Sequence, residues 1–502
     1  MAQALYPVQT FFRPQLLPPL LATALFLLLT AQPSMAASGA WTTVTTTNFV
    51  LYSCGAQEQN VHLLETLEQA RSFFARTTFA TALPQSPVKV IAFTDAEEYR
   101  RYQPGPGAYA FYQPARDADY IVLQDLNPEH DRVALHEYAH SVIRHTYAKL
   151  PLWLDEGLAD VYSSVEVQRE RFFLGRTLPD RAWALENLSP LSLETMFSAD
   201  RSSPYYRGGE KSSRFYARAW LFTHMLALGP AYSARFPAFV VALSAGQTSQ
   251  QALRTAYGKE VNQLEEELEA YSAKLELPSV QFDAAPVSSI EPRVSVPSRI
   301  EIELTLARLL ASNPEKQSDA KQSLARLAQE YPHHPAVHEL LAHMALEQNQ
   351  IADAQPHLAA AVTSGSTDPE LMYWYARAQS DAGAPPAQVI QLLERILAIQ
   401  PDNYYARLLL GCEAVKIGDC QLAISTLEGI KNIDPKDSFV FFATMAYCHV
   451  RAGDLQSGES YASQAQAHAQ TSSQESQAND LLAYIHGERN LLARAGTRSA
   501  LR

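Results

Sequence analysis

The stretch "LGCEAVKIGD" (410–419) is a helix-forming run that ends in a glycine turn, and similar runs recur through the C-terminal part of the chain. The turn residues of five such runs are separated by 36, 34, 35 and 35 positions. The other four runs are "LARLLASNPE" (306–315), "LAHMALEQNQ" (341–350), "YARAQSDAGA" (375–384) and "MAYCHVRAGD" (445–454), and the turn residues are Asn313, Asn349, Gly383, Gly418 and Gly453. Prolines separate the units at Pro335, Pro369, Pro401 and Pro435, where one helix is expected to give way to the next. This spacing predicts a series of helical hairpins.

Helix, turn, helix and a terminal proline at a period near 34 resemble the tetratricopeptide repeat. One hairpin cannot bury its apolar face alone, so stacked hairpins would share a continuous core and present a concave surface. About four to five units fit between residues 299 and 470, and residues 472–495 are expected to form a capping helix with a polar outer face. The resemblance implies that the repeats bind a protein partner. An unrelated helical bundle is the alternative, and the persistence of the period argues against it.

A segment rich in proline and serine, residues 282–298, precedes the repeats and predicts a linker. It divides a first domain at 37–281 from the helical repeat domain at 299–490. In the first domain, residues 41–53 and 88–93 are rich in β-branched and aromatic side chains, as strands are. A small sheet followed by mostly helical residues is an α+β pattern.

The first 36 residues have the pattern of a signal peptide. Arg13 precedes the apolar run "LLATALFLLLTA" (20–31), and the small-residue site "SMAA" (34–37) follows it, which predicts cleavage after Ala36. A membrane anchor is the alternative, but the run is about a dozen residues and a spanning helix needs roughly twenty. We therefore expect an exported protein, periplasmic or secreted, without a stable membrane span after cleavage.

The composition is that of a globular, acidic protein. Hydrophobic residues make up 47% of the chain, and Asp plus Glu exceed Lys plus Arg by 53 to 40. Because this surplus of negative charge would repel a phosphate backbone, nucleic acid is not an expected partner. Cys54, Cys412, Cys420 and Cys448 form no CxxC pair, so they suggest neither a zinc knuckle nor a redox motif. One disulfide among the last three is conceivable, and buried apolar side chains explain them equally well.

Three histidines, several carboxylates and a tryptophan lie in "ALHEYAHSVIRHTYAKLPLWLDEGLADVY" (134–162), which contains the pattern HExxH at 136–140. On a helix, His136 and His140 are one turn apart on the same face, so both imidazoles can reach one metal ion. Glu137 would then lie beside a metal-bound water. The flanking residues alternate with helical spacing, so the context fits the motif. A helix with two histidines that face the core is the alternative.

A catalytic zinc site takes three protein ligands and leaves a fourth position open. A metal site completed by a third histidine six residues after His140 is excluded, because that position is Thr146. On helical geometry, His145 and Asp155 are expected to point away. Glu156, on a second helix, is the favoured third ligand, with Asp160 as the alternative ligand. Asp160 lies four residues after Glu156 on the same face, where it could accept the free N–H of a ligating imidazole.

"HEYAH" (136–140) followed by "WLDEGLAD" (153–160) resembles the gluzincins of the peptidase MA-like superfamily over roughly residues 40–275. The resemblance implies a zincin-like domain with one Zn²⁺ bound by His136, His140 and Glu156. It also implies that Glu137 is the general base and that a metal-activated water hydrolyses peptide bonds.

A donor to the developing oxyanion is expected as well. Tyr216 is favoured because it begins a helix within the matching segment, and Tyr205, Tyr206 and His224 are the other candidates.

Two functions of different classes follow from these motifs. The first is an exported zinc metallopeptidase whose repeats recruit a protein substrate or partner. The alternative is a protein-binding scaffold in which the repeats bind a partner and the zincin-like domain is catalytically inactive. The intact set of ligands, base and Asp160 favours the enzyme. The zinc content of the protein, with Glu137→Gln as a control, would distinguish the two.

Overall fold

The computed structural model describes residues 40–76, 82–105, 108–147, 149–168, 171–273, 277–283 and 291–499. The predicted signal peptide at 1–36 therefore lies outside the described residues. Among the described helices, none is by itself long and apolar enough to cross a membrane. The segments 210–228 and 233–244 meet the length and composition test only together, as a pair bent by 87°.

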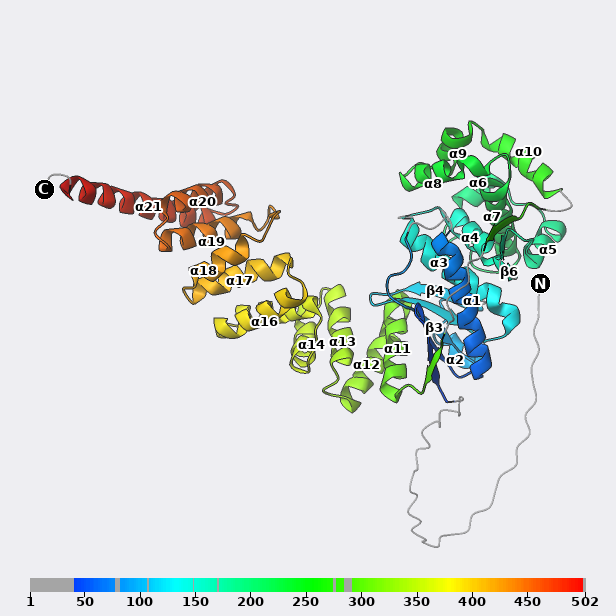
Figure 1. Ribbon diagram of the computed structural model, residues 1–502, viewed down its shortest axis with the longest axis horizontal. Helices are drawn as coiled ribbons and strands as arrows, with labels where there is room; N and C mark the ends of the chain where they lie inside the picture. The colour runs from blue at the N-terminus through cyan, green and yellow to red at the C-terminus, as the bar shows by residue number, and fades with distance from the viewer. Residues whose placement is uncertain are drawn as a thin grey trace, which may run out of the picture. The chain divides into compact units, whose positions relative to one another are not determined.

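A six-stranded mixed sheet with adjoining helices forms the first part of the described chain (Figure 1). Its strand order is β4-β5-β3-β2-β1-β9, in which β2, β3 and β5 are parallel and the other pairings are antiparallel. The strands are β1 Thr42–Thr45, β2 Phe49–Ser53, β3 Val88–Ala92, β4 Ala110–Pro114, β5 Asp119–Leu123 and β9 Arg293–Ser295. The first helices are α1 Gln57–Arg76, α2 Ala96–Arg100, η1 Pro128–His130, α3 Asp131–Thr146 and α4 Leu152–Ser163. A small sheet in a mostly helical protein is thus what the sequence predicted.

The remaining elements of the first part form a second, three-stranded sheet and a helical group. The sheet has the order β6-β7-β8, with β6 Glu166–Gln168, β7 Arg171–Leu174 and β8 Val280–Asp283. The helices are α5 Pro179–Asn187, α6 Leu193–Ser198, α7 Glu210–Leu228, η2 Ser233–Arg235, α8 Phe236–Ser244, α9 Ser249–Tyr257 and α10 Val261–Ser272. The buried helix α7 contacts α4, α5, α6 and α10, so it lies at the centre of this group.

The predicted linker contributes to both sheets. Residues 282–283 belong to β8, and Arg293–Ser295 is the strand β9 that pairs with β1. Residues 284–290 lie outside the described part of the chain. A strand of three residues flanked by prolines is too short to be recognised from its sequence, because its partner strand is about 250 positions away.

Both faces of the six-stranded sheet are buried. Because side chains alternate along a strand, each residue of β3 can be assigned to one face. Val88 and Val90 belong to the large core that includes α1 and α3. Ile91 points to the opposite face, where it belongs to a second core with Tyr99 of α2 and Leu309 of α11. The first helix of the repeats therefore covers one face of the sheet.

Polar contacts hold α11 to the same sheet. Asp117, in the turn between β4 and β5, forms ion pairs with Lys89 of β3 at 2.7 Å and Arg308 of α11 at 3.0 Å. The Tyr52 hydroxyl donates to Glu301 at 3.2 Å. Burial would raise the pKa of Asp117, but the two cations lower it below its ordinary value. The sheet and the start of the repeats are thus packed together rather than joined by a free linker.

The C-terminal part consists of five helical hairpins and a terminal helix, in the order that Figure 1 shows from green to red. Each hairpin contacts the next through its neighbouring helices, and small apolar cores lie within and between the pairs. The pairs are α11 Arg299–Ser312 with α12 Gln317–Glu330, α13 Pro335–Glu347 with α14 Ile351–Thr363, α15 Pro369–Asp381 with α16 Pro386–Ile399, α17 Tyr404–Lys416 with α18 Cys420–Leu427, and α19 Ser438–Arg451 with α20 Leu455–Ala467. The last helix is α21 Ser472–Ser499, and the short turn η3 Pro314–Lys316 lies within the first pair. The predicted repeats and the terminal helix are present.

The predicted turn residues explain the hairpins. Gly383, Gly418 and Gly453 have φ values of 75°, 80° and 85°, and Asn349 has 56°. Glycine adopts this left-handed region without a steric penalty, and asparagine tolerates it better than most residues. Asn313 differs, because it has extended backbone and caps the turn that follows it.

We expect Gly418→Ala to lower the free energy of unfolding by about 1–2 kcal/mol, because a Cβ is disfavoured at positive φ. A Cβ at this position would meet no atom within 4 Å, so the cost is conformational. Chemical denaturation measures it. Gly487→Ala is the control: it lies inside α21 in open space, where alanine should stabilise the helix. Equal effects of the two substitutions would contradict this account of the turns.

Candidate metal centre

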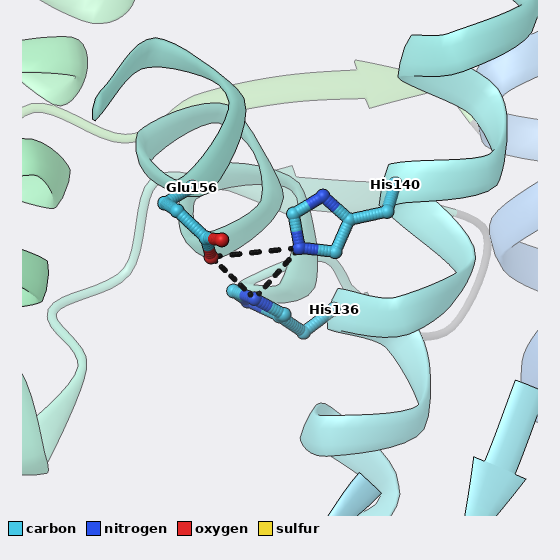
Figure 2. Close-up of side chains that lie close together, drawn as sticks. All are labelled: His136, His140 and Glu156. Carbon is cyan, nitrogen blue, oxygen red and sulfur yellow. Dashed lines mark hydrogen bonds and ion pairs between the residues drawn. The ribbon is translucent and has the colours of Figure 1, made fainter. Parts of the chain in front are cut away.

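The stretch 134–162 folds into two helices that meet at three side chains. The helix α3 carries HExxH and ends at Thr146, and α4 starts at Leu152, directly after Pro151. Proline is well tolerated at the start of a helix, and it disfavours helical backbone at the residue before it, here Leu150. His136 and His140 project from α3 toward Glu156 of α4 (Figure 2).

The donor atoms of these three residues converge on one point. Nε2 of His136 and Nε2 of His140 are 3.2 Å apart, and Oε2 of Glu156 is 3.3 Å from the first and 3.5 Å from the second. Ligands about 2.0–2.1 Å from a tetrahedral zinc ion are about 3.3 Å apart, so the three separations fit such an ion. Among the described residues, this is the one group of His, Cys, Asp and Glu that meets the spacing required for a metal.

Each histidine is also fixed from behind by a carboxylate. Oδ1 of Asp160 is 3.1 Å from Nδ1 of His136, and Oδ1 of Asp155 is 3.1 Å from Nδ1 of His140. An ionised carboxylate is only an acceptor, so each Nδ1 carries a proton, and Nε2 is the atom that binds a metal once its own proton has left. Asp160 is therefore not placed as the third ligand.

The prediction that Asp155 points away was wrong. Asp155 and Glu156 are adjacent, yet both reach α3, because α4 crosses close to that helix and the two carboxylates contact opposite nitrogens of the same His140 ring. Helical spacing assigns residues to faces of one helix and does not show how much of that helix a neighbour covers.

The electrostatics of the centre favour a cation. Burial would lower the pKa of His136, but hydrogen bonds to Asp160 and Glu156 raise it to about 9. Burial would likewise raise the pKa of Glu156, but the nearby imidazoles hold it well below its usual value. With the buried carboxylates of Glu156 and Asp160 and the partly buried carboxylate of Asp155 around two imidazoles, positive charge at this point is stabilised.

Glu137, the predicted general base, lies on the same helix and is buried. The pKa of its carboxyl group is raised, mainly by burial and also by the charge of Glu156. His136, His140 and a backbone hydrogen bond from Tyr112 offset only part of this increase. Tyr112 lies on the edge strand β4, and its ring stacks on His140 with centroids 6.5 Å apart. The metal centre therefore lies next to the edge of the sheet.

The predicted oxyanion donors have different positions. Tyr206 and Tyr216 both lie near Glu156, whose charge adds to burial in raising the pKa of each hydroxyl, and Tyr206 also hydrogen-bonds to that carboxylate. Tyr205 instead lies against Lys211. His224 is fully buried with both ring nitrogens engaged, by the Tyr271 hydroxyl and the Gly175 carbonyl, each at 2.8 Å.

His145 contacts Asp119 at 2.9 Å and takes no part in the three-ligand group. Two contributors were missed in the sequence. Tyr112 gave no signal because it meets α3 only through the fold. Arg181, which contacts Asp160, lies 21 positions along the chain in a separate helix.

We expect Gly157→Ala to destabilise the protein by about 1–3 kcal/mol, as overpacking of a core does. A Cβ at Gly157 would lie 2.1 Å from Oγ1 of Thr223 and 2.6 Å from the backbone oxygen of Ala219, so α4 and α7 would have to move apart. Since Glu156 is the preceding residue, metal binding should weaken as well. Thermal unfolding and metal titration measure the two effects, and unchanged values in both would contradict the close helix contact.

The sequence matches no family model and no curated protein. Solved structures that are similar include MamA residues 41 to the end from Desulfovibrio magneticus RS-1, with 16% identity and a TM-score of 0.26 over 33% of this chain and 91% of that one. YrrB, described as a TPR protein with an unusual peptide-binding site, has 14% identity and a TM-score of 0.29 over 36% and 90%. TTC0263, a TPR protein of Thermus thermophilus, has 15% identity and a TM-score of 0.22 over 36% and 98%.

These findings correct the identification made from the motif. The similar structures are tetratricopeptide-repeat proteins and not metallopeptidases, so the prediction of a gluzincin metallopeptidase, and with it of a hydrolytic enzyme, was wrong. The physical reason is that HExxH with a downstream glutamate specifies where donor atoms converge. It does not by itself specify a reaction, which also needs a bound substrate and groups that stabilise a transition state.

Proposed function

We propose that this chain is a protein-binding scaffold whose helical repeats bind a protein partner. The observation that carries the proposal is the run of five stacked hairpins from α11 to α20. Stacked helical repeats present an extended surface built from equivalent positions of successive units, and such surfaces suit the binding of another chain.

Exposed apolar side chains on neighbouring repeats support this proposal. Tyr405 lies in the first turn of α17 and is 45% exposed, and Val440 stands 35 positions later in α19 and is 39% exposed. Tyr447 is two turns further along α19 and is 40% exposed. Lys436 lies over the Tyr405 ring at 5.3 Å. Tyrosines that combine an apolar face with a polar tip are enriched where proteins meet.

We further propose that the first part of the protein holds one Zn²⁺ at His136, His140 and Glu156. The mixed nitrogen and oxygen donors and their separations fit this ion, and a carboxylate behind each imidazole supports it. Bound zinc would supply a positive charge that draws α3 and α4 together. The residues of the chain orient the donors, because Asp160 and Asp155 each fix one imidazole.

Export to the periplasm or the exterior is also proposed. It is supported by the apolar run and small-residue site in the first 36 residues. N-terminal sequencing of the mature protein tests it: a first residue at Ala37 agrees with the proposal, and an intact Met1 in the native host contradicts it.

Binding by the repeats can be tested by capture of partners from the native host with the full chain as bait. The bait variant Tyr405→Ala/Tyr447→Ala should lose a captured protein that the unaltered chain retains. Tyr484→Ala is the matched control, because Tyr484 is 55% exposed and lies on the terminal helix α21, outside the five hairpins. Loss of the same protein with both variants, or with neither, would contradict binding at the proposed surface.

A further inference from the structure

The carboxylate that holds His136 is itself held by an arginine from another helix. Arg181, on α5, donates from Nε to Oδ2 of Asp160 at 2.6 Å and from Nη2 to Oδ1 at 3.0 Å. Asp160 has no exposed surface, and its Oδ1 also contacts Nδ1 of His136. A planar guanidinium that makes two parallel bonds fixes both the position and the plane of a carboxylate.

Arg181 is in turn fixed on both sides. Its guanidinium lies 5.0 Å from the centre of the Tyr216 ring and forms an ion pair with Asp180 at 2.9 Å. Within the described part of the chain, the other arginine that pairs with Asp160 is Arg132, at 3.8 Å, beyond hydrogen-bond distance. Arg181 is therefore the arginine that both hydrogen-bonds to Asp160 and balances its negative charge. The pKa of Asp160, which burial would raise, is lowered to about 2 by this arginine and His136.

We infer that Arg181 is a positioning residue for the metal centre: it fixes Asp160, which fixes the His136 ring, and so sets the affinity of the site for zinc. The chain of contacts runs from α5 through α4 to α3. This inference rests on the proposed zinc site. Groups that orient metal ligands from behind typically change metal affinity about 10-fold to 100-fold when they are lost.

The second histidine supplies an internal comparison. Asp155 contacts Nδ1 of His140, as Asp160 contacts Nδ1 of His136. Arg201 then pairs with Asp155, with Nη2 of the arginine 3.7 Å from Oδ2 of the carboxylate. The Arg201 side chain is 73% exposed, whereas that of Arg181 is 18% exposed. Water and salt screen an exposed pair at this distance, so Arg201 should contribute little. The two arginines have equivalent places in the arrangement and differ in burial and geometry.

The test is a zinc titration of the full chain against a chromophoric chelator, with Arg181→Gln and Arg201→Gln compared. Arg181→Gln should weaken zinc binding about 10-fold to 100-fold, and Arg201→Gln by less than about threefold. The zinc affinity of Arg181→Lys should lie between those of the unaltered chain and Arg181→Gln, since lysine keeps the charge and loses the paired hydrogen bonds.

The Asp160→Asn variant distinguishes an action of Arg181 through Asp160 from a purely structural role of Arg181. If Arg181 acts through Asp160, the double variant Asp160→Asn/Arg181→Gln should bind zinc no more weakly than Asp160→Asn alone. Additive losses, or equal affinities of the Arg181→Gln and Arg201→Gln variants, would overturn the inference. If Arg181→Gln does not fold, Arg181→Lys decides, and unchanged zinc affinity in that variant would overturn it. Failure of the unaltered chain to bind zinc would instead overturn the proposed metal centre.

Discussion

Replacing His136 and Glu156 together by alanine should reduce bound zinc from one ion per chain to none. Two of the three donor atoms that converge in the structure would be lost, and a single histidine does not hold the ion. Binding of zinc to the folded state alone stabilises that state by about 4 kcal/mol at a thousandfold excess over the dissociation constant. Metal analysis and thermal unfolding with and without a chelator measure both effects, and the variant should show no response to the chelator.

His145→Ala is the matched control for this variant. His145 lies on the same helix as the ligands but pairs with Asp119, at 2.9 Å. The His145→Ala protein should keep its zinc and its response to a chelator. A double variant that still binds zinc, or a control that loses it, would show that the metal is held elsewhere.

Leu309→Ala should lower the stability of the sheet as well as that of the repeats. Leu309 is 2% exposed and belongs to the core formed with Ile91, Tyr120 and Val122. Truncation of a buried leucine to alanine costs about 2–5 kcal/mol. Because this side chain lies between α11 and the sheet, hydrogen exchange should become faster in β3 and β5 and in α11 together.

Leu358→Ala supplies the comparison for Leu309→Ala. Leu358 is equally buried, at 1% exposed, but packs within the repeats against Ala342, Ala354 and Leu371. It should accelerate exchange in the repeats and leave β3 and β5 unchanged. If both variants affect β3 and β5 alike, α11 does not cover the sheet as described.

Local patterns predicted the parts of this fold that depend on neighbouring residues. The helical hairpins follow from a period that recurs along the chain, and their turns follow from residues such as Gly418 that favour positive φ. The strand β9 and the packing of α11 on the sheet could not be predicted in this way. Both depend on pairings between residues far apart in sequence, and residues 282–298 were expected to form only a linker.

The candidate site likewise has features that neighbouring residues set and features that depend on residues far apart in the sequence. Helical spacing put His136 and His140 on one face, and the structure has their nitrogens beside Glu156. The contact of Asp155 was mispredicted and that of Arg181 was missed, since each depends on how one helix crosses another. The expectation of an enzyme failed for a different reason: ligand spacing is a local property, whereas a reaction requires the surroundings of the ligands.

The fate of a partner bound to the repeats tests the central claim most directly. The full chain loaded with zinc, its Glu137→Gln variant and the Tyr405→Ala/Tyr447→Ala variant would each be incubated with a captured partner. Binding constants and the length of the partner would then be followed over time. A scaffold predicts that the partner stays intact, that Glu137→Gln leaves binding unchanged, and that the repeat variant loses it. Cleavage of the partner that depends on zinc and disappears in Glu137→Gln would contradict the account.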